Sequence, residues 1–365
     1  MKIIVLGTRG IPNIQGGVET HCEQLYPLIQ SDNVQITIIR RIPYVTSENK
    51  TANYKGIILK DIYAPPSKYF ETFIHTFLGV LYARLKNPDI LHIHAVGPSL
   101  LTPLAKILGL KVVMTNHGPD YNRGKWGKIA KWTLKTSELL GTKYANRIIV
   151  ISEVINSILK TKYNRFDANV IYNGVKIHTR ALKTDYIDSL GLEKGKYIIG
   201  VGRFVEEKGF DDLIECFSNI KNQSVKLVLV GDADHETLYS RKLKEKATKK
   251  NIILTGFICG EKLNQTFSFA RLFIMPSYHE GLPIALLEAM SYNLDVLVSN
   301  IPANLEVNLE NEDYFKVGDI NDLTKKLEEK LSQTKNRNFE NLLKEKYDWS
   351  KIAEQTLSVY KSLVP

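Results

Sequence analysis

The sequence has few cysteines and no long apolar run. Only three of its 365 residues are cysteine, and Cys22, Cys216 and Cys259 lie far apart without metal-ligand spacing. This scarcity favours a reduced, cytosolic setting without a structural disulfide. No segment approaches the ~20 uninterrupted apolar residues of a membrane span, because the most apolar stretch, 90–115, is interrupted by histidines, prolines and a lysine. Residues 1–7 are too short for a secretory signal and predict a buried first strand.

Low-complexity segments and short-period repeats are also missing, which excludes a disordered chain or a solenoid. A chain of 365 residues is long for one domain, so two α/β domains are expected.

The charge is unevenly distributed along the chain. The first 180 residues hold 24 Lys and Arg against 11 Asp and Glu, whereas the remainder holds 25 against 28. The basic excess therefore belongs to the first half, where it favours anionic partners such as phospholipid headgroups, polyphosphate lipids or nucleic acid.

Short apolar runs alternate with helix-length stretches throughout the sequence. Strands are expected near Lys2–Gly7, Val34–Ile39, Gly56–Lys60, Ile90–Ile93, Lys111–Met114, Arg147–Ile151, Ala168–Tyr172, Lys196–Val201, Val225–Val230, Asn251–Thr255, Arg271–Met275 and Asp295–Ser299. Helices are expected at Gly17–Ile29, Tyr69–Lys86, Trp126–Tyr144, Gly209–Phe217, Glu236–Thr248, Gly260–Ala270 and Pro283–Tyr292. This alternation predicts two doubly wound α/β domains with parallel sheets, and places ligands in the cleft that the strand C-termini face.

The division between the domains is expected near 175–195, after the turn signal Asn173-Gly174. We assign residues 1–180 to the first domain, 181–345 to the second and 346–365 to a C-terminal helix that returns to the first.

The segment from His279 to Glu288 is the most informative motif. It follows a predicted strand, and Pro283 suits the first position of a helix. The backbone N–H groups from Gly281 through Leu282 to Ala285 would then suit a diphosphate. Glu280 and Glu288 could each accept hydroxyl hydrogen bonds, one from a sugar and one from a ribose; the alternative is a capping Glu and a surface Glu.

This segment resembles the glutamate-pair signature of glycosyltransferase family 4. A strand is followed by Glu-Gly-Leu-Pro, and a second Glu lies eight positions after the first. The resemblance extends over nearly the whole chain. It implies the GT-B fold of two Rossmann-like domains, with the donor held mainly by the second. It also implies that Glu280 contacts the donor sugar and Glu288 the ribose, with Gly281, Leu282, Pro283 and Ile284 at the diphosphate.

A second family signature spans residues 202–209, directly after the first strand of the second domain. Arg203 and Lys208, five positions apart at a strand-to-helix turn, can clamp both phosphates where charge develops as the glycosyl bond breaks. An ordinary basic loop is the alternative. Phe257 and Ile258, as in relatives, would border the base through their backbone.

In the first domain, Gly16 and Gly17 precede a helix and permit close backbone approach to a phosphate or an acceptor, although a flexible turn would have the same sequence. His117 follows a strand and matches the family histidine beside the donor sugar; Asp120 is a weaker candidate in that loop. His92 and His94 share one strand face, where His94 could line the site, but satisfied core histidines are equally expected.

No metal is expected, because the histidines and cysteines lack ligand spacing and Asp232-Ala233-Asp234 reads as a turn. The resemblance implies a retaining, front-face reaction. Arg203, Lys208 and the helix after Gly281 would stabilise the leaving diphosphate, while His117 orients or polarises the reacting face.

Basic residues flank aromatic ones at 68–86 and 123–147, which is typical of a helix on an anionic interface. The alternative is a solvated face whose tryptophans, Trp126 and Trp132, pack inward. The resemblance implies a hexosyl- or rhamnosyltransferase of the bacterial surface-polysaccharide type, and the basic first half leads us to expect it peripherally on the cytoplasmic face of the plasma membrane. Its donor would be a nucleotide diphosphate sugar. Its acceptor would be a saccharide, possibly polyprenyl-diphosphate-linked, in synthesis of O-antigen, capsule or exopolysaccharide.

Three other functions stay open from the sequence. An NADPH-dependent oxidoreductase could use Arg40-Arg41 for the 2′-phosphate, although the G-x-G-x-x-G fingerprint is absent. A GT-B-fold epimerase or hydrolase of nucleotide sugars is the second. Nucleic-acid binding through the basic half is the third, but no recognised module supports it.

Overall fold

The computed structural model describes residues 1–67, 70–119, 121, 127–221, 224–233, 236–333 and 335–364. The chain forms two compact units. Unit 1 comprises Met1–Gly174 and Tyr347–Pro365, and unit 2 comprises Val175–Lys346. The C-terminal helix thus returns to the first unit, and the first boundary lies at residue 174 rather than 180. No helix in the described ranges is both long and apolar enough to cross a bilayer.

Unit 1 is built on an eight-stranded sheet in the order β3-β4-β2-β1-β5-β6-β7-β8. All pairs are parallel except β3 with β4. Its central strands are rich in Ile, Leu and Val and are buried on both faces almost throughout, as a parallel sheet covered by helices requires. The strands are β1 Lys2–Leu6, β2 Gln35–Arg41, β3 Asn53–Tyr54, β4 Ile57–Ile62, β5 Ile90–His94, β6 Val112–Asn116, β7 Arg147–Val150 and β8 Asn169–Val170.

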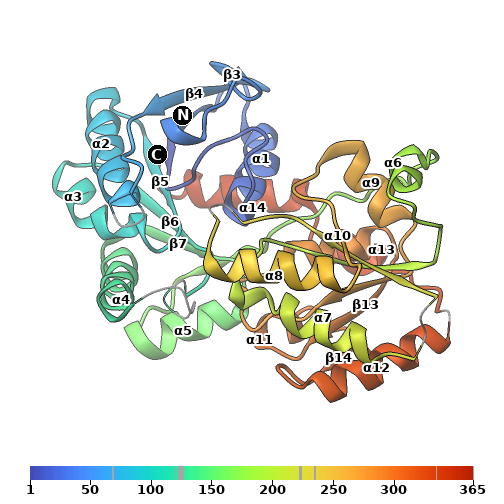
Figure 1. Cartoon of the computed structure of the whole chain (residues 1–365). Coiled ribbons are helices and arrows are strands. Elements are labelled where there is room, and N and C mark those ends of the chain that lie inside the picture. The colour runs from blue at the N-terminus through green and yellow to red at the C-terminus, as the bar shows by residue number, and fades with distance from the viewer. Residues whose placement is uncertain are drawn as a thin grey trace. The chain divides into compact units, whose positions relative to one another are not determined.

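Helices cover both faces of this sheet. Figure 1 shows α2 and α3 on one side of the strands and α1 with α14 on the other. The helices of unit 1 are α1 Gly17–Ile29, α2 Glu71–Lys86, α3 Thr102–Ile107, α4 Lys128–Tyr144, α5 Glu153–Tyr163 and α14 Trp349–Lys361, with short turns η1 Ile42–Tyr44 and η2 Pro98–Leu101.

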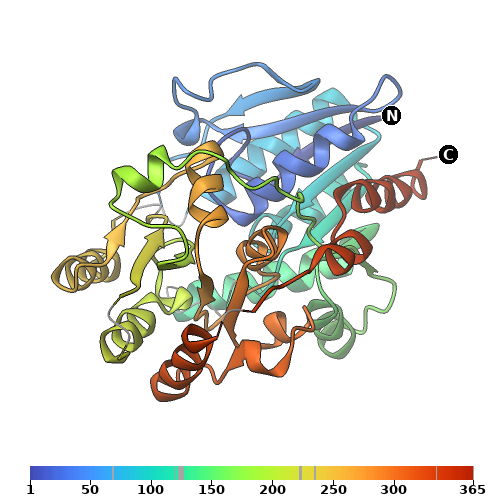
Figure 2. The same ribbon diagram turned by 90° about the vertical axis from the view of Figure 1, so that its right-hand side faces the viewer.

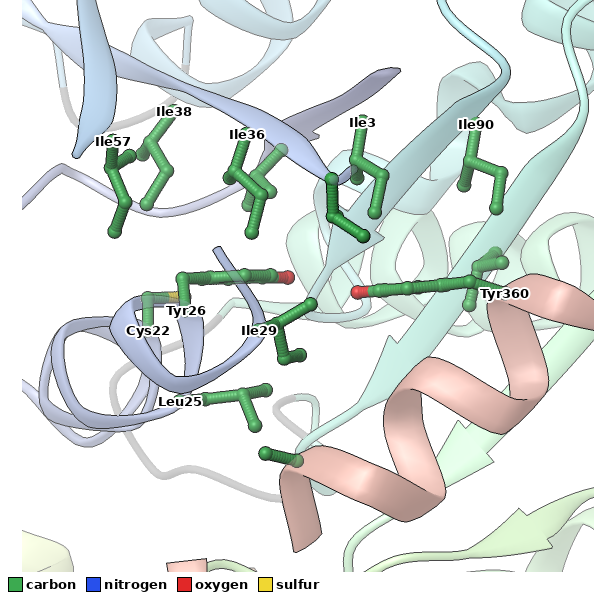
Figure 3. Close-up of a cluster of buried hydrophobic side chains, with 14 of the residues drawn as sticks. Ile3, Cys22, Leu25, Tyr26, Ile29, Ile36, Ile38, Ile57, Ile90 and Tyr360 are labelled. Carbon is green, nitrogen blue, oxygen red and sulfur yellow. The ribbon is translucent and has the colours of Figure 1, made fainter. Parts of the chain in front are cut away.

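Helix α14 lies beside α1, although more than 300 residues separate them in the sequence (Figure 2). Its apolar face, with Ile352, Val359 and Tyr360 buried, packs with α1 against Ile3 and Ile36 of the sheet (Figure 3). Burying each large apolar side chain contributes about 1.5–3 kcal/mol, so this contact anchors the C-terminus to unit 1.

Unit 2 contains a six-stranded parallel sheet in the order β11-β10-β9-β12-β13-β14. Its strands are β9 Tyr197–Val201, β10 Lys226–Val230, β11 Ile253–Leu254, β12 Leu272–Met275, β13 Asp295–Ser299 and β14 Tyr314–Phe315. Its helices are α6 Asp185–Ser189, α7 Phe210–Asn219, α8 Leu238–Lys249, α9 Gly260–Ser268, α10 Ile284–Ser291, α11 Pro302–Leu305, α12 Ile320–Ser332 and α13 Glu340–Lys346, with turns η4 Glu206–Lys208 and η5 Asn311–Asp313.

Each sheet has one topological switch point, at which the chain stops adding strands on one side of the first strand and begins to add them on the other. We call this point the winding change. In unit 1 the chain adds β2 and β4 on one side of β1 and then β5 to β8 on the other; in unit 2 it adds β10 and β11 on one side of β9 and then β12 to β14. Doubly wound folds bind ligands at the carboxyl ends of the two strands that flank such a point. These strands are β1 and β5 in unit 1, and β9 and β12 in unit 2.

Candidate functional site

The two motif-bearing loops of unit 2 follow β9 and β12 and are joined to each other. The backbone N–H of Tyr278 donates to the Glu207 carbonyl at 2.9 Å. Gly209 has φ +63°, and a Cβ there would lie 2.3 Å from the Pro276 carbonyl oxygen. Only glycine permits this approach, which brings the two predicted signatures together at the winding change.

Lys208 and Glu280 form an ion pair in that position. Lys208 Nζ lies 2.6 Å from Glu280 Oε1, and Ser277 Oγ donates to the same oxygen at 2.7 Å. Burial opposes ionisation of Glu280, but the Lys208 charge and the two hydrogen bonds outweigh it and lower the pKa of this carboxyl group. Within the described residues Oε2 accepts no hydrogen bond. The sequence predicted both side chains for the site but not their pairing.

Arg203 lies at the start of the same loop, directly after β9, and is half-buried. The next residue ties the loop to the strand on the other side, because Phe204 N donates to the Asp232 carbonyl at 3.1 Å. The predicted cation therefore projects from a backbone that is fixed at the carboxyl edge of the sheet.

Helix α10 begins at Ile284, so Pro283 is its N-cap and not its first residue, which corrects the sequence prediction by one position. Pro283 still has no N–H to leave unpaired, whereas the Ile284 N–H already donates to the Leu282 carbonyl at 3.0 Å. Glu280 precedes the helix and Glu288 lies on it, as expected. Burial raises the pKa of Glu288 to about 7, so it is about half ionised at neutral pH.

Phe257 and Ile258 follow β11, one strand beyond β10 at the same edge. Gly231 and Gly256 form an isolated bridge, in which Gly231 N donates to the Gly256 carbonyl at 2.9 Å. Phe257 is 49% exposed, which leaves its ring accessible.

In unit 1, the loop after β1 is closed by a buried glutamate. Glu19 Oε1 accepts from the Arg9 N–H at 2.9 Å and from Thr8 Oγ1 at 3.2 Å. Gly16 has φ +149°, and a Cβ on it would lie 2.0 Å from Glu19 Oε2. The need for Gly16 thus has an internal explanation, and its predicted contact with a ligand, like that of Gly17, stays a prediction.

His117 comes directly after β6 and is half-buried. Its Nε2 lies 2.9 Å from His94 Nδ1, and the two rings are stacked with centroids 5.2 Å apart. Burial is the main cause that lowers the pKa of His117 well below its usual value, so the ring is neutral. A neutral imidazole can donate one hydrogen bond and accept another without adding charge.

The structure decides the alternatives that the sequence left open for His92 and His94. Both are fully buried: His92 Nε2 meets Thr115 Oγ1 at 2.7 Å, and His94 Nε2 meets the Tyr26 hydroxyl at 2.5 Å. His92 is a satisfied core residue. His94 is also a core residue, but it connects Tyr26 to His117.

Sequence reasoning missed three members of this network. Tyr360 on α14 contacts His92 Nδ1 at 2.6 Å, and Figure 3 shows the hydroxyls of Tyr26 and Tyr360 pointing toward one another. His21 Nδ1 lies 2.8 Å from Asn173 Oδ1. A polar residue on the apolar face of each predicted helix was the available signal.

Other predicted residues either fall outside the described ranges or have internal partners. Asp120, Trp126 and Asp234 fall outside the described residues. Arg40 is 1% exposed and bonds Asp61 and three backbone carbonyls, while Arg41 pairs with Glu71 at 2.8 Å. These internal partners occupy the arginines that an NADPH site would have needed.

A pocket of about 260 Å³ in unit 2 lies apart from these loops and contains none of the predicted donor residues. Its polar side chains are already engaged, since His178 stacks on Tyr292 and Arg180 donates to the Tyr292 carbonyl at 2.7 Å. We do not place the donor there.

Two family models match the chain. The model described as glycosyltransferase family 4 matches residues 15–179, and the model described as glycosyl transferases group 1 matches residues 183–346. Only the first 14 residues, the three between the matches and the C-terminal segment lie outside them. The chain belongs to these glycosyltransferase families, and His117 lies within the first matched range, whereas Arg203, Lys208, Glu280 and Glu288 lie within the second.

Individual relatives agree with this assignment. The chain is 25% identical to an uncharacterized glycosyltransferase of Methanocaldococcus jannaschii, over 99% of this chain and 98% of the relative. It is 26% identical to a capsular polysaccharide biosynthesis glycosyltransferase, CapH, of Staphylococcus aureus (67% and 68%). It is 29% identical to the Escherichia coli UDP-Gal:alpha-D-GlcNAc-diphosphoundecaprenol alpha-1,3-galactosyltransferase (61% of each).

Solved structures share the fold. Sucrose-phosphate synthase from Thermosynechococcus elongatus aligns with a TM-score of 0.85 at 19% identity, over 99% and 98% of the two chains. Alr3699/HepE of Anabaena in complex with UDP-glucose aligns with a TM-score of 0.80 at 18% identity, over 99% and 100%. The chain is therefore a glycosyltransferase with the GT-B fold.

Proposed function

We propose that this enzyme transfers a sugar from a nucleotide diphosphate donor to a saccharide acceptor with retention of anomeric configuration, without a metal at the diphosphate. The observation that carries the proposal is the Lys208–Glu280 pair at the winding change of unit 2, with Arg203 on the adjoining backbone. A GT-B relative solved with UDP-glucose makes a UDP-sugar the first donor to test.

The pair gives donor binding a physical basis. Lys208 is preorganised by Glu280, which is itself held by Ser277, so little side-chain freedom is lost when the ammonium group also meets a phosphate. Arg203 supplies a second, bidentate cation, and the start of α10 adds backbone dipoles. Three positive elements can neutralise a diphosphate as the glycosyl bond breaks.

The two glutamates bind the groups attached to the two ends of the diphosphate, which are the sugar and the ribose. Glu280 keeps Oε2 for a sugar hydroxyl, and Glu288 accepts from the ribose hydroxyls in its ionised form. Neutral His117 orients the sugar or the acceptor hydroxyl. The leaving phosphate itself takes the acceptor proton, so no side chain needs to act as a covalent nucleophile.

The enzyme is proposed to act in cell-surface polysaccharide synthesis on a lipid-linked acceptor. Two relatives carry names that support this proposal, one for capsule synthesis and one for transfer to a diphosphoundecaprenol-linked sugar. Whether the transferred sugar is a hexose or a rhamnose is part of the donor screen.

An exposed surface of unit 1 supports docking to an anionic membrane. On α2, Phe73, Phe77, Leu81 and Leu85 recur every fourth residue and are 38–84% exposed, so they form one apolar stripe. On α4, Trp132 is 69% exposed, which excludes the inward packing that the sequence had left open for it. We name α2, α3 and α4, with these side chains, the outer helical face.

Basic residues lie on the same helices. Exposed cations of the outer helical face are Arg84, Lys86, Lys128, Lys135 and Lys143. Basic and aromatic residues together on an exposed helix bind anionic lipid interfaces, since cations meet headgroups while rings enter the acyl boundary.

The activity is tested by incubating the protein with UDP-, GDP- and dTDP-sugars and an undecaprenyl-diphosphate-linked saccharide. The expected result is release of nucleoside diphosphate that depends on acceptor, with an α-linkage formed from an α-linked donor. Inversion would contradict the retaining mechanism, and acceptor-independent hydrolysis or epimerisation would contradict transfer.

Membrane docking is tested by sedimentation with vesicles of phosphatidylglycerol. Wild type should bind at low salt and be released at high salt, and Trp132→Ala with Leu85→Ser should weaken binding about tenfold. Leu182, 94% exposed in unit 2, gives the matched control Leu182→Ser. Equal binding of neutral vesicles would contradict docking by charge.

A further inference from the structure

Three histidines converge at the carboxyl edge of the first sheet. His21 comes from α1, His94 ends β5 and His117 follows β6. One ring nitrogen of each lies within 4.8 Å of the other two. They are far apart in the sequence, and only the winding change at β1 and β5 brings them together.

One of these nitrogens has no partner. His21 is 2% exposed, and its Nδ1 is bonded to Asn173 Oδ1, so its Nε2 is buried without a hydrogen bond among the described residues. If Nδ1 carries the proton, as an amide oxygen requires, Nε2 holds a lone pair. A buried polar atom without a hydrogen-bond partner is unfavourable, which makes it a site for a ligand.

The other two histidines can present lone pairs to the same point. His94 Nδ1 and His117 Nε2 are 2.9 Å apart, so one proton lies between them. His94 Nε2 lies 2.5 Å from the Tyr26 hydroxyl, whose oxygen can accept as well as donate. If His94 carries its proton on Nε2 and donates to Tyr26, its Nδ1 becomes a free donor atom for a metal.

We propose that His21, His94 and His117 form a three-histidine site for one divalent transition-metal ion, of which Zn²⁺ and Co²⁺ are the best fits. The ion takes the place of the proton between His94 and His117. That proton moves to His94 Nε2, and Tyr26 turns its own proton toward His92 Nδ1, 2.9 Å away, an acceptor that it then shares with the Tyr360 hydroxyl at 2.6 Å. All three ligands stay neutral, so no proton is released and no charge is buried besides that of the ion.

The surroundings meet the further requirements of such a site. Metal-bound histidines donate their other N–H to an oxygen, and Asn173 and Tyr26 supply that oxygen for His21 and His94. Tetrahedral Zn–N bonds of about 2.0–2.1 Å need nitrogens roughly 3.3 Å apart, which lies between the 2.9 Å pair and the 4.8 Å limit. His117 is half-buried, so the cluster is not sealed from solvent on all sides.

The consequence for catalysis rests on the proposed function. A metal on His117 Nε2 fixes this ring and adds positive charge at an edge that is proposed to orient neutral hydroxyl groups, so Zn²⁺ should inhibit transfer. The donor loops of unit 2 contain none of these ligands, and nucleotide binding there should not depend on the ion.

The experiment is a titration of the metal-free protein with Co²⁺, followed by visible absorption, with Zn²⁺ as the displacing ion. Wild type should show one equivalent of Co²⁺ with the intense bands of low-coordinate cobalt, and Zn²⁺ should abolish them. His21→Gln should bind at least about 100-fold more weakly, more than the loss of an outer partner, and Asn173→Ala about 10-fold to 100-fold more weakly.

The matched control is His178→Gln, since His178 is a partly buried, hydrogen-bonded histidine of unit 2. It should bind Co²⁺ as wild type does, and each variant should keep the wild-type melting temperature within a few degrees. Absence of bound Co²⁺ in the folded wild type, or equal binding by His21→Gln, would overturn the proposal. UDP-glucose binding measured on the same samples separates this failure from failure of the proposed function.

Discussion

The two sheets place different chemistry at equivalent positions. At the winding change of unit 2 stand a lysine and a carboxylate in an ion pair, with an arginine beside them. At the winding change of unit 1, neutral histidines in the interior are bonded to tyrosines and to one another. Under the proposed function, the charged edge would bind the diphosphate and the neutral edge the hydroxyl groups, because only the charged edge must compensate a developing negative charge.

The comparison also explains where the basic excess of the first half lies. Unit 1 does not concentrate its cations at the histidine edge; many are on the outer helical face. A positive total for a domain therefore does not identify its catalytic edge, and in this protein it identifies the surface proposed to meet the membrane.

Removing the cation of the charged edge should have the largest effect. Lys208→Ala should lower kcat/KM for transfer about 10²- to 10³-fold, as loss of a preorganised donor to a developing charge does. The control is Lys246→Ala, which removes another ion-paired lysine of unit 2, bonded to Glu215. Equal kinetics for the two variants would remove the contrast between the edges.

Separating the two loops of unit 2 should cost stability. Gly209→Ala places a Cβ 2.3 Å from the Pro276 oxygen at φ +63°, so the free energy of unfolding should fall by about 3 kcal/mol. Gly195→Ala is matched, because Gly195 has φ +71° but no atom within 4 Å of the added Cβ, and should cost about 1 kcal/mol. Chemical denaturation of both variants measures the difference, and equal losses would show that the close approach is unimportant.

The neutral edge should depend on its tyrosine. Tyr26→Phe removes the hydroxyl that meets His92 and His94, and should lower the free energy of unfolding by about 1–3 kcal/mol. Tyr54→Phe loses only a hydrogen bond of 3.2 Å to Glu23 near the surface, and should change the free energy of unfolding by less than about 1 kcal/mol. If both variants unfold alike, the buried network contributes little.

A smaller effect should appear in the pH dependence of donor binding. The folded-state pKa of Glu288 is about 7, and ribose hydroxyls favour its ionised form, so affinity for UDP-glucose should fall about tenfold from pH 8 to pH 6. Glu288→Gln should bind more weakly at pH 8 and lose most of this slope. A slope that the variant retains would assign the titration to another group.

The same residue should also affect stability with a definite sign. Because the folded-state pKa lies above the ordinary glutamate value of 4.5, the folded protein binds more protons than the unfolded chain between about pH 4.5 and 7. Stability from this group is therefore present below pH 4.5 and is lost as the pH rises to 7. Glu288→Gln should be more stable than wild type at pH 8 by about 1–3 kcal/mol, and a loss of stability there would contradict the burial of the carboxylate.

Much of the fold was predictable, because periodic apolar runs are a local property of the sequence. The central strands β1, β5, β9, β12 and β13 lie within a residue or two of the predicted ranges. Two-residue strands such as β3 and β14 were not predicted, since pairing partners rather than local pattern create them. The position of Pro283 was wrong by one residue because helix ends depend on the hydrogen bonds actually formed.

The chemistry of the candidate site was less predictable than its location. Arg203, Lys208 and Glu280 were found because each follows a strand, but the Lys208–Glu280 contact joins residues 72 positions apart. His21, Tyr26 and Tyr360 lie on helices whose pattern looks only amphipathic. Nothing local in the sequence shows that the two hydroxyl groups meet His92 and His94, or that the His21 ring lies near His94.

Calorimetric titration with UDP-glucose tests the central claim most directly. The account predicts saturable binding by wild type and a loss of at least about 100-fold in affinity when Arg203→Gln and Lys208→Gln are combined in a protein that melts normally. A folded double variant that binds UDP-glucose as tightly as wild type would show that the diphosphate is held elsewhere.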